Sequence, residues 1–346
     1  SRFVLEQFGL KFMPLAEGVR RFMDEVEAGL PDAEVLVTEP AMCPDAVAGS
    51  AAVRPAAANP RSGSLVADVT HRADVTWVTF RLDPTSDRFL LEHKQFGRPL
   101  LPAVMGAELI AQAAIAAGLD AGEIRDFAVE RPIGFPVDKP REIRVEVGPV
   151  RTGRCDVRGW AGVLNADGRA AGEDRVHVSG VVTVGPVEPI VASLDEPPFP
   201  YNPMVYQDDA PMWHGPGFRT LTGLFLDRSG GWGRLVAPDA DVIAGPRGAE
   251  GWTVPVAILD GCIVACAVYS YILCGRRVEV PVRFERLRIA ARPERGEKCT
   301  VRMQFRSQDA RESVYDMVLF GADGRPLVAV DGLHLAVMGS ERSRPA

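Results

Sequence analysis

The stretch His93-Lys-Gln-Phe-Gly97-Arg-Pro-Leu-Leu-Pro102 stands directly before a mostly apolar run from Ala103 to Leu119. The glycine and the prolines are typical of a loop, whereas an apolar run of that length is typical of a buried helix. The sequence therefore predicts a loop that carries His93 to the mouth of a buried helix. The alternative for His93 is an ordinary surface histidine.

A second apolar run, from Val254 to Cys274, contains one acidic residue, Asp260. A lone carboxyl group among apolar side chains is costly unless it is paired or has a function. Apolar surroundings favour its protonated form, which can donate a proton. The run therefore predicts a buried helix that presents a proton donor. A capping role for Asp260 at the end of the helix is the alternative.

Strand-like segments follow each apolar run, so the sequence shows a duplicated pattern. Ala166-Asp-Gly-Arg169 recurs as Ala322-Asp-Gly-Arg325, and both Asp-Gly pairs predict hairpin turns. Alternating apolar and polar residues indicate sheets with one buried face. The predicted fold class is α+β, with two antiparallel sheets that each wrap a long apolar central helix. The expected strands centre on residues 126–132, 141–147, 155–164 and 176–184 in the first copy, and on 280–289, 299–306, 313–320 and 327–337 in the second.

The spacing His93-x3-Gly97-x4-Pro102 resembles the signature of the dehydratase domains of polyketide and polyunsaturated fatty acid synthases. The stretch Asp87-Arg-Phe-Leu90 just upstream adds to this likeness. The resemblance covers about residues 64–340. It implies a double-hotdog fold, which agrees with the duplicated pattern of helices and strands.

Two further stretches match this family less completely. Met212-Trp-His214-Gly215-Pro216-Gly-Phe218 resembles its Tyr-Gly-Pro-x-Phe loop, with His214 where tyrosine is usual. Asp260 resembles the acid of its Asp-x3-Gln/His motif, but Val264 stands at the polar fourth position. Because valine cannot hold a carboxyl group by a hydrogen bond, we expect His214 to lie within hydrogen-bonding or water-bridged reach of Asp260 or of the bound hydroxyl. The alternative for His214 is packing on Trp213 in an ordinary turn.

The resemblance implies that the chain dehydrates a β-hydroxyacyl thioester to the α,β-enoyl thioester. In that reaction His93 would be the general base and Asp260 the proton donor, a pair suited to removing water. Backbone N–H groups at the motif glycine and at the start of the first helix could polarise the thioester carbonyl. The expected substrate-binding positions are Gly97, Pro102, His214, Gly215, Pro216, Phe218 and Val264.

Two other functions fit the same fold. The first is double-bond migration or oxa-cyclisation, which would use the same base. The second is a catalytically degenerate hotdog that serves as a scaffold between neighbouring domains. Val264 and His214 favour the scaffold, because both depart from the family pattern.

No cofactor or metal ion is expected in this domain. The sequence has no glycine-rich nucleotide loop between a strand and a helix, and its six cysteines form no Cys-x2-Cys pair. The resemblance implies that the substrate arrives on the phosphopantetheine arm of an acyl carrier protein, beside neighbouring synthase domains. It is also compatible with a homodimer. The candidate docking surface for an acidic carrier, which could equally be a solvated face, comprises Arg276, Arg277, Arg283, Arg286, Arg288 and Arg292.

Charge and composition exclude some classes of function. A net charge of −7 and a pI of about 5.4 argue against nucleic-acid binding. The cysteine usage and the lack of a signal-peptide pattern favour a reducing cytoplasm. The run from Val254 to Cys274 is long enough to cross a bilayer, but the internal repeat favours a core helix, and no membrane partner is expected.

The domain organisation follows from these patterns. The chain lacks a start methionine and is expected to be a piece of a longer protein. The expected parts are residues 1–42, a helix–strand tail that resembles the end of a preceding ketoreductase domain; 43–63, a linker; 64–185, the first hotdog; 186–211, a Pro-rich linker; and 212–340, the second hotdog.

Overall fold

The computed structural model describes residues 65–197, 200–276 and 278–337. The expected tail over residues 1–42 and the linker over 43–63 lie outside the described residues. The chain divides into a unit over Ser1–Ala58 and a unit over Asn59–Ala346, and all of the described residues belong to the second.

The first half of the described chain carries one long helix, α4 (Ala103–Ala116), with four strands before it and four after it. A short helix and two short strands precede α4 and form the loop that carries His93. The other elements are β1 (Val66–Arg72), β2 (Val75–Leu82), α3 (Arg88–Leu91), β3 (His93–Gln95), β4 (Arg98–Pro99), β5 (Glu123–Val129), β6 (Arg141–Val147), β7 (Arg154–Ala161) and β8 (Arg175–Thr183).

The second half repeats this arrangement around the helix α6 (Val256–Leu273). Its first strand, β9 (Asn202–Pro203), falls within the segment expected to be a linker. The remaining elements are β10 (Met212–His214), the 3-10 helix η2 (Pro216–Phe218), β11 (Leu221–Asp227), β12 (Gly230–Val236), α5 (Ala240–Ala244), the 3-10 helix η3 (Gly245–Arg247), β13 (Glu279–Ile289), β14 (Lys298–Gln308), β15 (Glu312–Phe320) and β16 (Pro326–Val337).

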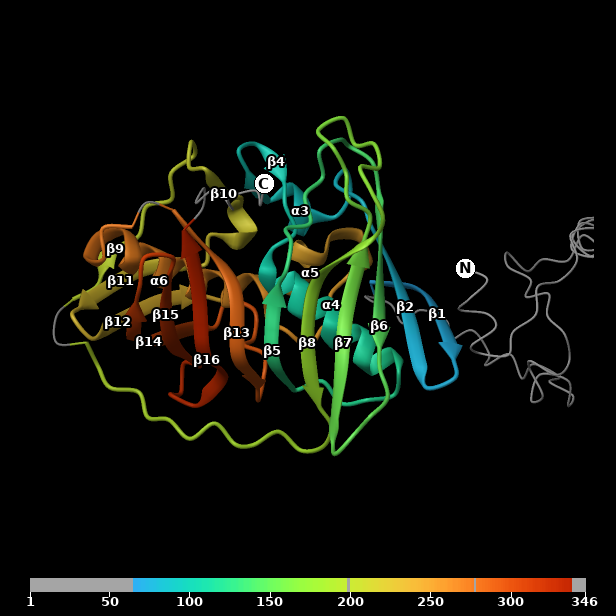
Figure 1. Cartoon of the computed structure of the whole chain (residues 1–346). Helices are drawn as coiled ribbons and strands as arrows, with labels where there is room; N and C mark the ends of the chain where they lie inside the picture. Colours follow the sequence, from blue (N-terminus) through green and yellow to red (C-terminus); the bar gives the residue numbers. More distant parts are fainter. Residues whose placement is uncertain (1–64, 198–199, 277, 338–346) are drawn as a thin grey trace, which may run out of the picture. The chain divides into compact units, whose positions relative to one another are not determined.

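The long strands form one continuous thirteen-stranded sheet, with the order β1-β2-β6-β7-β8-β5-β13-β16-β15-β14-β12-β11-β9 (Figure 1). Apart from β9, the order reads symmetrically outward from the β5–β13 pair, which confirms the internal duplication. The prediction of two separate sheets is wrong, because the long strands of both halves belong to one sheet. Edge strands carry unpaired backbone groups, and β5 and β13 satisfy theirs by pairing with each other in antiparallel register.

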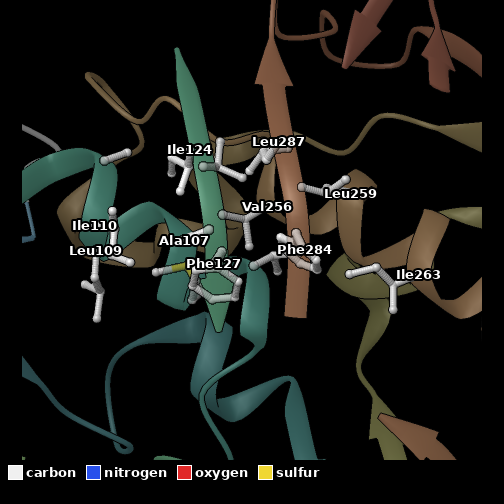
Figure 2. Packing of buried hydrophobic residues seen from close by; sticks show 14 of the residues in the cluster. Ala107, Leu109, Ile110, Ile124, Phe127, Val256, Leu259, Ile263, Phe284 and Leu287 are labelled. Carbon is white, nitrogen blue, oxygen red and sulfur yellow. The ribbon is translucent and has the colours of Figure 1, made fainter. Parts of the chain in front are cut away.

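Each half of the sheet packs on its own helix. Helix α4 contacts β2 and β5 to β8, whereas α6 contacts β11 to β13 and β15, and the two helices also contact each other. Figure 2 shows the junction, where the stacked rings of Phe127 and Phe284 lie between side chains of the two helices. Helix α6 is long and apolar enough to span a membrane, but 67% of it is buried inside the protein, as in a core helix.

A second, three-stranded sheet with the order β10-β3-β4 joins the loops of the two halves. Strand β10 pairs antiparallel with β3, so that His214 lies opposite His93 and Trp213 lies opposite Lys94. This small sheet is what brings the second half's loop onto the histidine loop of the first half.

Candidate active site

His93 begins strand β3 and is held by a backbone carbonyl. Its Nδ1 lies 2.8 Å from the carbonyl oxygen of Leu100. A carbonyl can only accept, so Nδ1 carries the proton and Nε2 keeps a free lone pair when the ring is neutral. The loop geometry therefore selects the tautomer that can act as a base through Nε2.

The surroundings of His93 keep its ring neutral. Only 5% of the residue is exposed. Burial lowers the pKa of His93 to about 4, because desolvation outweighs the opposing attraction of Asp260, and the neighbouring His214 lowers it further. The ring is therefore unprotonated at neutral pH, which a general base requires. The alternative of a surface histidine is wrong.

Gly97 and Pro102 shape the loop around His93. Gly97 has a φ of +76° in the exposed turn between β3 and β4, a conformation that favours glycine. Pro102 is the N-cap of α4, and its carbonyl accepts hydrogen bonds from the N–H groups of Met105 and Gly106. The turn and the cap fix where the histidine strand ends and where α4 begins.

Asp260 lies in the second turn of α6, with 5% of the residue exposed. No hydrogen bond reaches its Oδ2 atom within the described part of the chain. Nε2 of His214 lies 3.1 Å from this oxygen, without the alignment that a hydrogen bond requires. Oδ2 is thus a buried acceptor that a bound group could satisfy.

His214 completes a cluster with His93 and Asp260. The rings of the two histidines meet edge to face, with centroids 5.3 Å apart. One nitrogen from each histidine and one oxygen of Asp260 all lie within 4.8 Å of one another. The prediction that His93 and Asp260 face each other is confirmed, as is the expected closeness of His214 to Asp260.

The loop after His214 is held by Glu92, a residue that the sequence patterns did not single out. The N–H of Gly215 donates to the Glu92 carbonyl at 2.7 Å, and the N–H of Gly217 donates to its Oε2 at 2.6 Å. A Cβ on Gly215 would lie 2.7 Å from side-chain carbons of Glu92, so only glycine fits there. The one signal available in the sequence was an acidic residue directly before the motif histidine.

Two residues of this loop have simple structural roles. Pro216 begins η2, in the position where a missing N–H costs nothing. Phe218 is fully buried, and its ring centroid lies 5.9 Å from that of His93. Together they fix the turn that holds His214 in place.

Val264 lies one turn after Asp260 and packs on the core.

Tyr206 is a polar group near the same carboxyl that the sequence patterns also missed. Its hydroxyl accepts from the N–H of Leu221 at 3.2 Å, and its ring lies edge to face with His214. Burial raises the pKa of Tyr206, and the charge of Asp260 adds to this effect. The side chain therefore stays protonated and can act as a donor.

Glu108 of α4 is fully buried and contacts the start of the other central helix. Its carboxylate accepts hydrogen bonds from the backbone N–H of Val254 at 2.7 Å, from that of Thr253 at 3.1 Å and from Gln112. Burial raises the pKa of Glu108 to about 7 despite these bonds. The contact links the two halves just before the helix that carries Asp260.

The arginines of the candidate docking surface interact mainly with their own chain. Arg277 lies outside the described residues. The other five arginines each have a partner in the chain: Arg276 pairs with Glu279, Arg283 with Glu285, Arg286 with Glu123 and Glu188, and Arg288 with Asp331, and Arg292 donates to the carbonyl of Trp252. These pairs favour a solvated face over a free cationic surface.

Comparison with known families gives two matches, which together cover most of the chain. A model described as polyketide synthase dehydratase domain matches residues 64–160. A model described as polyketide synthase dehydratase N-terminal domain matches residues 206–345. No curated protein matches the chain.

Solved structures with the same fold include several dehydratase domains. That of RzxB from Pseudomonas fluorescens is 17% identical, with a TM-score of 0.63, and the match covers 79% of this chain and 98% of that one. A bifunctional dehydratase-cyclase domain of ambruticin biosynthesis is 19% identical, with a TM-score of 0.61 and coverage of 80% and 97%. A trans-AT polyketide synthase dehydratase domain from Brevibacillus brevis is 17% identical, with a TM-score of 0.63 and coverage of 80% and 98%.

Proposed function

The chain belongs to the dehydratase domains of polyketide synthases, and we propose that it acts on a β-hydroxyacyl thioester held by an acyl carrier protein. Its reaction removes water and leaves the α,β-enoyl thioester. The observation that supports the assignment of residues is the cluster of buried His93, half-buried His214 and buried Asp260, drawn from both halves of the fold.

His93 is the general base in this proposal. Its Nε2 lone pair takes the proton from the α-carbon, while the Leu100 carbonyl holds the other ring nitrogen. The electron pair of the broken C–H bond forms the new double bond as the β-hydroxyl leaves. The low pKa of the buried ring keeps the lone pair available throughout the neutral range.

Asp260 is the proton donor. It must enter the reaction protonated, so that its proton joins the departing hydroxyl and water is released. The unpartnered Oδ2 atom can meet that hydroxyl, and His214 supplies the polar neighbour that Val264 cannot. Transfer of the proton from His93 back to Asp260 restores both groups for the next turnover.

The remaining predicted positions shape the site in this proposal. The start of α4 after Pro102 offers backbone N–H groups to the thioester carbonyl, where the helix dipole favours developing negative charge. Gly97 sets the turn of the histidine loop, and Gly215, Pro216 and Phe218 hold His214 over the site.

The base and the acid both come from the chain, so the proposed reaction requires no cofactor in this domain. The substrate reaches the site on the phosphopantetheine arm of the carrier, and the domain works beside other synthase domains in the cytoplasm. The dimeric state and the docking face of the carrier stay predictions.

The test is the mass of the carrier-bound acyl chain after incubation with the full chain. We expect the β-hydroxyacyl carrier to lose the mass of one water molecule. Double-bond migration or oxa-cyclisation of an enoyl substrate would leave the mass unchanged and shift only the chromatographic position. A protein that changes no hydroxyacyl carrier would favour the scaffold function.

A further inference from the structure

The residues at the centre of the site are also a set of metal ligands. His93, His214 and Asp260 come from β3, β10 and α6, and their three ligand atoms lie within 4.8 Å of one another. Two imidazoles and one carboxylate form a donor set that first-row transition metals and zinc use in proteins. Three protein ligands also leave a coordination position open for a small molecule.

Two further observations point to a cation. The first is the buried Oδ2 of Asp260, a polar atom without a hydrogen bond that is directed toward His214. The second is the bond from Nδ1 of His93 to the carbonyl of Leu100. Histidines that bind metals through one nitrogen generally donate the other N–H to such an acceptor, which orients the ring.

We propose that this cluster binds a divalent ion of borderline softness, such as Zn²⁺ or Co²⁺, and that the bound ion blocks dehydration. Zinc–ligand distances of about 2.1 Å put tetrahedral ligand atoms about 3.4 Å apart. His214 and Asp260 already approach to 3.1 Å. The widest pair, at up to 4.8 Å, must close by about 1.4 Å, which rotation of the side chains can supply.

Inhibition follows from the atoms that the ion would occupy. It takes the lone pair of His93 that would receive the α-proton, and it holds Asp260 as a carboxylate with no proton to give. Substrate and ion therefore compete for the same atoms. His214 is the ligand that creates the site, because a tyrosine at this position would remove one imidazole from the set.

The first experiment measures binding without turnover. Co²⁺ is titrated into the metal-free full chain, and its visible absorption is recorded. We expect one ion per chain with nitrogen and oxygen ligation and no thiolate charge-transfer band. His214→Tyr and Asp260→Asn should each weaken binding by at least about 100-fold, since loss of even an outer partner of a ligand costs about 10–100-fold. His71→Ala removes an exposed histidine of β1 and should leave the affinity unchanged.

Each result decides for or against the site. Circular dichroism identifies any variant that fails to fold, and the other variant then carries the test. Equal affinity of the parent and a folded His214→Tyr or Asp260→Asn protein would contradict the proposal. A thiolate band would place the ion on cysteine instead, and a spectrum unchanged at millimolar Co²⁺ would also overturn it.

The second experiment measures inhibition. Zn²⁺ should raise the KM for the hydroxyacyl carrier without changing kcat, and a chelator should restore the original value. Mg²⁺ in excess should have no effect, because it prefers all-oxygen sites. Inhibition that persists at saturating substrate would contradict competition at this cluster. The Co²⁺ spectrum does not depend on dehydratase activity, so this proposal and the proposed function can fail separately.

Discussion

The carboxylate of Glu108 in α4 accepts a hydrogen bond of 2.7 Å from the backbone N–H of Val254, two residues before α6 begins at Val256. Glu108 therefore anchors the helix that carries Asp260 to the half of the fold that carries His93. The distance between base and acid depends on this contact between the halves.

Glu108→Gln should change how stability depends on pH. Burial raises the pKa of Glu108 to about 7, above its ordinary value of 4.5. The folded state thus holds the proton more tightly than the unfolded state does. The protonated carboxyl therefore adds up to about 3 kcal/mol to the free energy of unfolding below about pH 4.5, and this stabilisation is lost as the pH rises through about 7. Urea unfolding at several pH values measures this free energy. Relative to its own value near pH 4, it should fall with rising pH in the parent protein and not in the variant. Parallel curves would contradict an ionisable Glu108 at this contact.

Glu92 should matter for catalysis although it touches no reacting atom. Glu92→Ala removes the acceptor for the N–H of Gly217 and leaves that donor buried, a loss of about 1–3 kcal/mol. Because this loop holds His214, we expect at least a tenfold lower kcat. Glu92→Gln retains a carbonyl acceptor and should recover most of the rate. Equal rates for the two variants would show that the bond does not position the loop.

The sequence predicted the elements that bear strong periodicity. The two central helices and eight of the strands follow from apolar runs and alternation, and the proximity of His93 and Asp260 follows from the duplication. The hairpin β1–β2 was missed because β1 is mostly exposed, and the hairpin β11–β12 was missed because three glycines in Gly230-Gly-Trp-Gly233 weaken the strand pattern.

The other contacts between the halves could not be predicted from the sequence patterns. Pairing of β5 with β13 is a contact between two edges, and neither edge carries a local signal for its partner. The same holds for the bonds of Glu92 and Glu108, whose partners lie in the other half. Local patterns predict which side chains are buried, whereas partners distant in sequence depend on how the two repeats meet.

The pH dependence of kcat/KM should reflect the low pKa of His93. Burial lowers this pKa to about 4, so the base should stay unprotonated well below the usual histidine range. We expect the acid limb of the profile to fall below about pH 5. A limb near the ordinary value of 6.5 would indicate a solvated histidine or another base.

His214 should be replaceable by tyrosine but not by phenylalanine. Its Nε2 lies 3.1 Å from Oδ2 of Asp260, so a polar group is present where Val264 offers none. His214→Phe should lower kcat far more than His214→Tyr, whose hydroxyl can meet the same carboxyl. Equal rates for the two variants would mean that the imidazole has no polar role.

Val264→Gln should rescue the His214→Phe protein. Residue 264 lies one helical turn from Asp260, so a glutamine there can hydrogen-bond the unpartnered carboxyl oxygen. We expect the double variant to recover at least part of the rate lost by His214→Phe. A double variant as slow as the single one would show that the two positions do not substitute for each other.

The rate of water loss in a His93→Ala protein tests the account most directly. The mass of the acyl chain on the carrier is measured over time with the parent protein, with His93→Ala and with His71→Ala. His71→Ala is the matched control, because it removes an exposed histidine. We predict that His93→Ala folds but loses activity by about 100-fold or more, the usual contribution of a general base, while the control keeps the parent rate. Water loss by a folded His93→Ala protein at the parent rate would contradict it.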